Sequence, residues 1–313
     1  MSGDLMESNI LNNNVILKRL GLLLLLCMNL VMISQGRAVS YSLPQAGSDL
    51  IAEDHTISVT EGQTLADIAE QYSLGFNELV AANSGLDPWI PKPGSQVTLP
   101  AQTILPEHRS GVVINLAEYR LYYFPPMTNK VITYPVGIGR IGWDTPVTKT
   151  RVTGKNKDPW WRVPQSVRQE HRKQGRELPE MVRPGKDNPL GGYAINLGLP
   201  GYLLHGTNKG FGIGTRVSHG CIRLRNTDIE ALYQQLPEGT EVSIMNQPVK
   251  VGWHQGKLML EVHPALEKQE FNSLTPVTAA IVKHIQNTEI DIDWDKVLSI
   301  ARKQQGIVQQ ISK

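Results

Sequence analysis

The chain has 313 residues, of which 40% are hydrophobic and 19% are charged, and its formal net charge is +2. This length allows more than one domain, each with a core of its own. The near-neutral charge and the few aromatic residues, which are not interleaved with a basic stripe, argue against nucleic acid as a partner.

The N-terminus has the order of charged, apolar and small residues that is typical of a secretory signal. Lys18 and Arg19 precede the apolar run 21–33, and small residues follow up to Ala38. Because the run is short for a membrane span, we expect residues 1–38 to be a signal peptide and no stable span to remain after its cleavage. An uncleaved membrane anchor is the alternative. Both interpretations place the rest of the chain outside the cytosol.

The cysteine count makes one residue stand out. Cys27 lies inside the predicted signal, so cleavage leaves Cys221 as the single cysteine. Cysteines in an oxidising compartment are usually paired. A lone thiol there is either buried and inert or kept for chemistry, and its surroundings must decide between the two.

After a polar leader, residues 39–54, the segment 55–100 predicts a compact strand–helix–helix–strand unit. Ile57 and Val59 alternate with polar residues, as in a short strand. Thr64 can cap a helix with an apolar face, and a second short helix and a closing strand follow. This pattern alone also fits a plain α+β spacer.

The same segment resembles a LysM module. The resemblance rests on residues 59–69 (VTEGQTLADIA), on the stretch 77–83 and on the dipeptide Pro93-Gly94. It implies that residues 55–100 bind the N-acetylglucosamine-containing glycan of peptidoglycan.

Residues 101–110 are predicted to be a linker, and a β-rich domain is predicted over 111–245. Its strong strand formers are residues 112–114, 119–124 and 131–136. The stretch 137–142 satisfies G-x-G-x-x-G, but no helix follows that could face a pyrophosphate. We therefore interpret these glycines as a tight turn. The polar stretch 155–190, with a basic helix over 166–174, is either a lid over the substrate or a solvated insertion.

The residues that carry chemistry follow this insertion. A predicted strand, 202–204, ends at His205, and a glycine-rich loop separates it from Cys221. With an ordinary pKa near roughly 8.5, a cysteine is only a few per cent thiolate at neutral pH. A nearby imidazole can take its proton and later return it to a leaving amine. Gly220 lets backbone N–H groups approach an oxyanion, and Arg223 suits a substrate carboxylate, so the pattern indicates acyl transfer through a thioester.

Three alternatives apply to these residues. Cys221 could be a packed core thiol, although its polar neighbours do not form an apolar pocket. His205, His219 and Cys221 could bind zinc, although their spacing matches no common zinc signature. His219 could be the base in place of His205 or share that role, and otherwise it is an oxyanion-side or positioning group. We favour His205 and expect neither a metal nor another cofactor.

Residues 218–223 (SHGCIR), together with the upstream His205-Gly206-Thr207, resemble the L,D-transpeptidase catalytic domain of the YkuD type. The resemblance runs from about residue 111 to residue 244 and implies a Cys221 nucleophile and a His205 proton acceptor. The candidate catalytic residues are Cys221, His205, His219 and Gly220. The candidate substrate-binding residues are Arg223, Ser218, Gly206 and Thr207. The fold expected from both resemblances is α+β, a β-rich catalytic domain preceded by a small βααβ module.

The family resemblance also implies a substrate. The donor is a peptidoglycan tetrapeptide stem, cleaved between the L-centre of meso-diaminopimelate and D-alanine, and an amine then resolves the acyl-enzyme. The domain order resembles enterobacterial enzymes that attach the major outer-membrane (Braun) lipoprotein to the wall through its C-terminal lysine, whereas close relatives make 3→3 diaminopimelate cross-links. We expect a periplasmic enzyme with stem peptides, glycan and that lipoprotein as partners. An inactive wall-binding protein and a thiol or zinc hydrolase are the competing hypotheses.

The C-terminal part has fewer signals. Thr227 and Glu230 predict a helix that begins with a capping box. A β/helical extension is predicted over 246–313, without an assigned function. Its predicted strands are 249–251 and 257–262, and its predicted amphipathic helix lies around residues 294–301.

Overall fold

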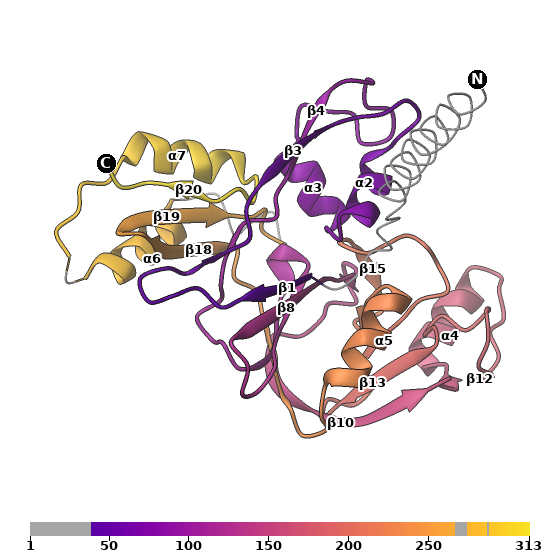
Figure 1. Ribbon diagram of the computed structural model, residues 1–313. Coiled ribbons are helices and arrows are strands. Elements are labelled where there is room, and N and C mark those ends of the chain that lie inside the picture. Colours follow the sequence, from indigo (N-terminus) through magenta and orange to yellow (C-terminus); the bar gives the residue numbers. More distant parts are fainter. Residues whose placement is uncertain (1–38, 267–273, 287) are drawn as a thin grey trace, which may run out of the picture. The chain divides into compact units, whose positions relative to one another are not determined.

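The computed structural model describes residues 39–266, 274–286 and 288–313 (Figure 1). The predicted signal peptide, residues 1–38, lies outside the described residues. Among the helices of the described segments, none is both long and apolar enough to cross a membrane.

The largest sheet has nine strands in the order β1-β8-β7-β6-β17-β10-β13-β14-β16. The pairs β6–β17 and β14–β16 are parallel, and the other neighbours are antiparallel. The strands are β1 (Val39–Ser42), β6 (Gly111–Asn115), β7 (Arg120–Phe124), β8 (Lys130–Pro135), β10 (Thr148–Lys157), β13 (Tyr193–Leu197), β14 (Leu203–His205), β16 (Ile222–Arg223) and β17 (Glu241–Met245). The predicted β-rich domain is confirmed.

One helix covers the part of this sheet that carries the candidate site. Helix α5 (Asn226–Gln235) packs beside β13 and β14 and buries Ile229 and Leu232 (Figure 1). The predicted capping box is wrong. Arg225 is the N-cap residue and its side chain makes no cap bond, while the carboxylate of Glu230 accepts a hydrogen bond from a tyrosine hydroxyl of β13.

The predicted leader and linker are both parts of the folded unit. In β1, Tyr41 pairs with Val131 of β8. The residues of β2 (Leu50–Ile51) are buried and pair with β5 (Thr103–Ile104), which lies in the expected linker. These strands are too short to carry a strong local pattern. They form because they pair with strands that are distant in the sequence.

The strand–helix–helix–strand order predicted for residues 55–100 is confirmed. The elements are β3 (His55–Ser58), α2 (Leu65–Gln71), α3 (Phe76–Ala82) and β4 (Gln96–Leu99), and β3 pairs with β4. Thr64 and Asp67 form a reciprocal capping box at the start of α2. Leu65, Ile68 and Leu79 are fully buried in the core of this unit.

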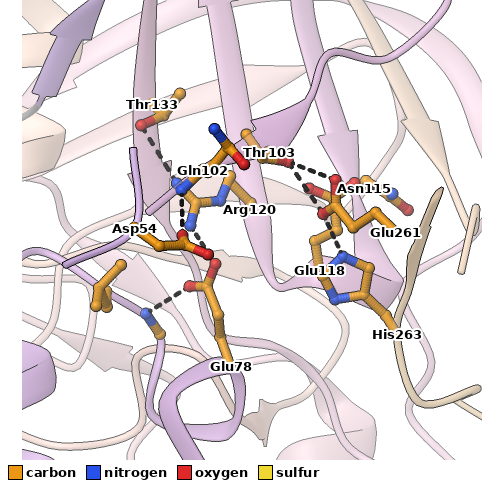
Figure 2. A network of polar contacts seen from close by, with 12 residues as sticks. Asp54, Glu78, Gln102, Thr103, Asn115, Glu118, Arg120, Thr133, Glu261 and His263 are labelled. Carbon is orange, nitrogen blue, oxygen red and sulfur yellow. Dashed lines mark hydrogen bonds and ion pairs between the residues drawn. The ribbon is translucent and has the colours of Figure 1, made fainter. Parts of the chain in front are cut away.

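This unit contacts the large sheet through a buried ion pair. Glu78 of α3 pairs with Arg120 of β7, and the two side chains are 6% and 3% exposed (Figure 2). Nearby, the backbone N–H of Asn77 donates to the carbonyl of Gly214 at 3.1 Å. A Cβ atom at Gly214 would lie 2.3 Å from the Cα atom of Gly75, so the two backbones touch.

The C-terminal residues form a second, smaller layer. The sheet contains β18 (Val249–His254), β19 (Lys257–Val262) and β20 (Gln309–Gln310), with α6 (Thr275–Ile285) beside β18 and α7 (Trp294–Lys303) beside β19 (Figure 1). The two strands and the terminal helix predicted for this extension are confirmed.

Four charged or titratable side chains meet where this layer joins the large sheet. The Nζ atom of Lys250 lies 3.0 Å from a carboxylate oxygen of Glu118 and 2.9 Å from one of Glu261. His263 contacts Glu261 at 2.6 Å, and Thr103 of β5 donates to the same carboxylate (Figure 2). Glu118, Lys250, Glu261 and His263 are called the core cluster below.

Candidate active site

Strands β14 and β16 bring three of the predicted residues together. Their parallel register pairs His205 with Arg223, and paired residues of neighbouring strands project to the same face of a sheet. Cys221 directly precedes β16, and the backbone N–H of Leu203 on β14 forms a hydrogen bond to its sulfur. The positive charge of Arg223 acts on both Cys221 and His205.

The thiol of Cys221 is in its neutral form at neutral pH. Burial raises its pKa, and this effect outweighs the bond from Leu203 and the charge of Arg223, which lower it. The Sγ atom lies 3.5 Å from the carbonyl oxygen of Gly201, and Cys221 as a residue is half-buried. In the described part of the chain, no hydrogen bond joins this thiol to His205.

His205 is buried and also neutral. Burial, followed by the charge of Arg223, lowers the pKa of His205 to about 4, against a smaller opposing effect of the bond to Gly206. The Nδ1 atom lies 2.6 Å from the carbonyl oxygen of Gly206. Because a carbonyl only accepts, Nδ1 carries the proton and Nε2 keeps its lone pair. This is the tautomer that can take a proton from a thiol.

The residues before Cys221 form a tightly bonded loop. The hydroxyl of Ser218 accepts from the N–H of Gly220 at 3.1 Å and donates to the carbonyl of Cys221 at 2.5 Å. The carbonyl of Gly220 accepts from the Thr145 hydroxyl at 2.8 Å. Gly220 has a φ of +101°, and a Cβ atom there would lie 2.8 Å from the Tyr202 ring. In this structure, Ser218 and Gly220 therefore hold the shape of the loop.

The segment after His205 is held by a residue for which the sequence offered no signal. The side chain of Asn226 accepts from the N–H of Thr207 at 3.0 Å and donates to its carbonyl at 2.7 Å. A Cβ atom at Gly206 would lie 2.2 Å from Oδ1 of Asn226, so only glycine fits there. The Thr207 hydroxyl accepts from the N–H of Lys209 at 3.1 Å. These contacts thus hold the backbone of Gly206 and Thr207 in place next to His205.

Arg223 is half-buried between the candidate base and a neighbouring strand. Its backbone exchanges two hydrogen bonds of 2.8 Å with Gly137. Among the described residues, its buried Nε atom has no hydrogen-bond partner. A buried donor without a partner is costly, so an anion that accepts from Arg223 would be stabilised here.

His219 contacts two charged residues that the sequence analysis missed. Its Nε2 atom lies 2.7 Å from a carboxylate oxygen of Glu170 and 3.0 Å from Nη2 of Arg140. Arg140 also pairs with Glu170, and the Trp143 ring packs edge-on against His219. Arg140, Glu170 and His219 are called the loop cluster below. Arg140 comes from the glycine-rich turn after β9 (Ile138–Gly139), which pairs with β15 (Arg216–Ser218).

Glu170 comes from the insertion 155–190. This segment contains β11 (Trp161–Arg162), α4 (Gln165–Lys173) and β12 (Met181–Val182), with β11 paired to β12. The predicted basic helix is confirmed as α4. Nothing in its local pattern distinguishes Glu170 from the other charged residues around it.

The three residues that the sequence offered as zinc ligands do not bring their ligand atoms together. Over the described ranges, one group of three His, Cys, Asp or Glu residues has converging ligand atoms, and it consists of Glu118, Glu261 and His263. His205, His219 and Cys221 form no such group. In the core cluster, the ammonium group of Lys250 lies within 3.0 Å of a carboxylate oxygen of Glu118 and within 2.9 Å of one of Glu261.

Residues 109–244 match the YkuD family model, the L,D-transpeptidase catalytic domain. Relatives of the same designation cover most of the chain, so the protein belongs to the L,D-transpeptidase family and is an enzyme of that class. The chain is 46% identical over 252 residues to "Probable L,D-transpeptidase YcfS" of Escherichia coli strain K12, which is 77% of this chain and 78% of the relative. It is 43% identical over 286 residues to "Probable L,D-transpeptidase ErfK/SrfK" of that strain, covering 88% and 91%. Identity to "Probable L,D-transpeptidase YbiS" is 42% over 272 residues, covering 85% and 89%.

Proposed function

We propose that this L,D-transpeptidase works in the periplasm on the tetrapeptide stem of peptidoglycan, with Cys221 as nucleophile and His205 as base. The observation that carries the proposal is that the neutral imidazole of His205 pairs with Arg223 across the parallel strands β14 and β16, while the neutral thiol of Cys221 directly precedes β16. The charged, apolar and small residues of 1–38 support export.

Because Cys221 and His205 are both neutral before the reaction, acylation does not start from a thiolate–imidazolium ion pair. The thiol proton is transferred during the attack. As the sulfur of Cys221 attacks the carbonyl carbon between diaminopimelate and D-alanine, its proton moves to Nε2 of His205. The tetrahedral intermediate collapses when the C–N bond breaks, and the imidazolium returns the proton to the leaving amine of D-alanine. The stem remains bound to Cys221 as a thioester.

The second half-reaction transfers the acyl group to an amine. A neutral amine attacks the thioester carbonyl, His205 accepts the proton that the amine loses, and the C–S bond breaks. The thiolate is reprotonated by the imidazolium. The acceptor in our proposal is the C-terminal lysine of the major outer-membrane lipoprotein, and a second diaminopimelate is the alternative outcome of the assay below.

Arg223 is assigned to an anionic group of the substrate. The unpartnered Nε donor supports this role, because a guanidinium binds a carboxylate with two parallel hydrogen bonds. Its charge also lowers the pKa of the Cys221 thiol and the pKa of His205. A bound carboxylate would reduce both effects.

Residues 55–100 are assigned to glycan binding as a LysM module. The βααβ order supports the assignment, as does an exposed aromatic surface. Trp89 is 61% exposed and lies against Phe76, with ring centroids 5.3 Å apart. Exposed aromatic rings suit the apolar faces of sugars.

The experiment that tests the proposal is mass spectrometry of the protein after incubation with a soluble tetrapeptide stem. We expect an adduct on Cys221, with one D-alanine released per adduct, and no adduct in Cys221→Ala. Lysine-terminated peptide and free tetrapeptide are then offered as competing acceptors, because the product mass identifies which amine is used. Full turnover by Cys221→Ala, or loss of the acyl group to water alone while both amines are present, would overturn the proposal.

A further inference from the structure

The insertion that carries α4 makes one direct polar connection to the loop of Cys221. Glu170, on α4, contacts Nε2 of His219 at 2.7 Å, and it also pairs with Arg140. Across the described residues, no other side chain of α4 has a hydrogen bond to the segment 218–221. Glu170 is 23% exposed and His219 is 30% exposed, so both are partly shielded from water.

The direction of this hydrogen bond follows from the charge of Glu170. Its bond from Arg140, followed by its bond from His219, lowers the pKa of the Glu170 carboxyl. The group is therefore ionised at neutral pH and can only accept. The bond to His219 consequently requires a proton on Nε2, since an acceptor nitrogen would face an acceptor oxygen. Nη2 of Arg140 lies 3.0 Å from the same nitrogen. In this arrangement both nitrogens are donors, and both donate to the carboxylate of Glu170.

Because of the position of His219 in the loop, this bond restrains the loop backbone. His219 stands between Ser218 and Gly220, whose polar atoms hold the backbone of Cys221. The loop is held at Gly220 by the Thr145 hydroxyl and at Ser218 by the N–H of Arg140, which donates to the Ser218 carbonyl at 3.0 Å. Glu170 adds a contact at His219, from an element 49 residues earlier in the chain.

We propose that Glu170 is a positioning residue for the transpeptidase reaction: it holds His219 by its Nε2 proton and thereby fixes the loop that presents Cys221. The proposal rests on the proposed function of Cys221. It also divides the work between the two histidines. Nε2 of His219 is committed to the carboxylate, while Nε2 of His205 has the free lone pair that the thiol proton needs.

The test compares Glu170→Ala and Glu170→Gln with a matched control, Glu180→Gln. Glu180 belongs to the same insertion, pairs with Arg168 at 2.9 Å and is 80% exposed, away from the loop cluster. We expect kcat for transfer from a soluble stem to fall roughly 10-fold or more in Glu170→Ala, with a smaller change in KM, because a shift of the nucleophile by a fraction of an ångström lowers the rate steeply. Glu170→Gln should lie between this variant and the wild type, since its amide oxygen still accepts from Nε2. The control should match the wild type.

Two further measurements separate positioning from a general loss of structure. Nitrogen-15 NMR of the histidine side chains should show a proton on Nε2 of His219 in the wild type and in Glu180→Gln, and exchange between tautomers in Glu170→Ala. The rate of Cys221 alkylation by iodoacetamide, which needs no ordered substrate, should stay within about 2-fold of the wild type in all three variants. If Glu170→Ala does not fold, the proposal is tested by kcat of Glu170→Gln and by the NMR spectrum of the wild type.

The inference is overturned if kcat in Glu170→Ala equals that of the control, or if Nε2 of His219 carries no proton in the wild type. Acyl-enzyme formation is measured on the same wild-type sample. Its absence would refute the proposed function, whereas normal acylation with indifferent Glu170 variants would refute the positioning role alone.

Discussion

The core cluster and the loop cluster use the same kinds of side chain in opposite surroundings. The four side chains of the core cluster are 1–5% exposed, whereas the three of the loop cluster are 23–36% exposed. Each contains a histidine bonded to a glutamate. In the core cluster water cannot replace a lost partner, while in the loop cluster it can.

This difference predicts which property each cluster controls. A buried charge that loses its partner keeps its full desolvation penalty, so the core cluster should determine stability. A half-exposed pair contributes little to stability because solvent screens it. The loop cluster should therefore affect turnover through geometry, with little effect on the free energy of unfolding.

The largest stability effect is expected for Lys250→Met. The variant leaves the carboxylates of Glu118 and Glu261 buried without their cation, which should cost about 3–5 kcal/mol of unfolding free energy. Urea unfolding followed by circular dichroism measures it. The control is Lys283→Met, because Lys283 pairs with Glu107 at the surface, where the two side chains are 61% and 57% exposed, and we expect a change below about 1 kcal/mol. Equal effects of the two variants would contradict the comparison.

The next largest effect is expected for Glu78→Ala. This variant leaves the guanidinium of Arg120, 3% exposed, without its carboxylate, and should cost about 3 kcal/mol. Glu61→Ala, an exposed position of the same unit, should change stability by less than about 0.5 kcal/mol. Because Glu78 lies in α3 and Arg120 in β7, we expect one unfolding transition shared by both. Two separate transitions in the wild type would mean that residues 55–100 fold independently.

A smaller, pH-dependent effect is expected from Glu261. Burial alone would raise its pKa, but Lys250, His263 and the N–H of Ile104 together lower the pKa of Glu261 to about 2 from an ordinary 4.5. The unfolded chain therefore binds this proton more readily, so the stabilisation is complete above pH 4.5 and is lost as the pH falls toward 2. Urea midpoints across this range should decrease in the wild type and decrease less in Glu261→Gln. Parallel curves for the two proteins would exclude Glu261 as a source of the acid sensitivity.

The smallest stability effect is expected for Glu170→Ala. Removal of this partly exposed carboxylate should leave the unfolding free energy close to that of the wild type, although we expect turnover to fall. Urea unfolding of the variant beside Lys250→Met gives the direct contrast. A loss comparable to that of Lys250→Met would show that the loop cluster is a structural support, and the distinction between the clusters would disappear.

Elements with local signals could be predicted from the sequence. Thr64 and Asp67 indicate the start of α2, and His205 stands at the end of a strand as expected. The short strands β1 and β5 were missed, because two to four residues carry too little pattern and their strand character comes from the partner. Helix α5 begins one residue earlier than expected, with Arg225 at the N-cap position and no cap bond from its side chain, so the hydroxyl of Thr227 did not mark the helix start.

The residues of the candidate site also fall into two groups, those that the sequence identifies and those that it does not. The residues of the SHGC motif and His205 are recognisable because their chemical types occur together within a short stretch. Arg140, Glu170 and Asn226 carry no such signal, because a charged or amide side chain in a turn or a polar helix is usually solvated. Their contacts with His219 and Thr207 depend on how distant segments pack.

The sequence by itself determined the family, the nucleophile candidate and the strand–helix–helix–strand order of residues 55–100, since these depend on residue types, spacings and periodicity along a single stretch of chain. Only the tertiary structure decided that Lys250 is buried between two carboxylates, that Glu78 and Arg120 join two units, and that Glu170 holds His219. The physical reason is desolvation. Whether a charge is costly, screened or paired depends on what surrounds it, and those neighbours come from remote parts of the chain.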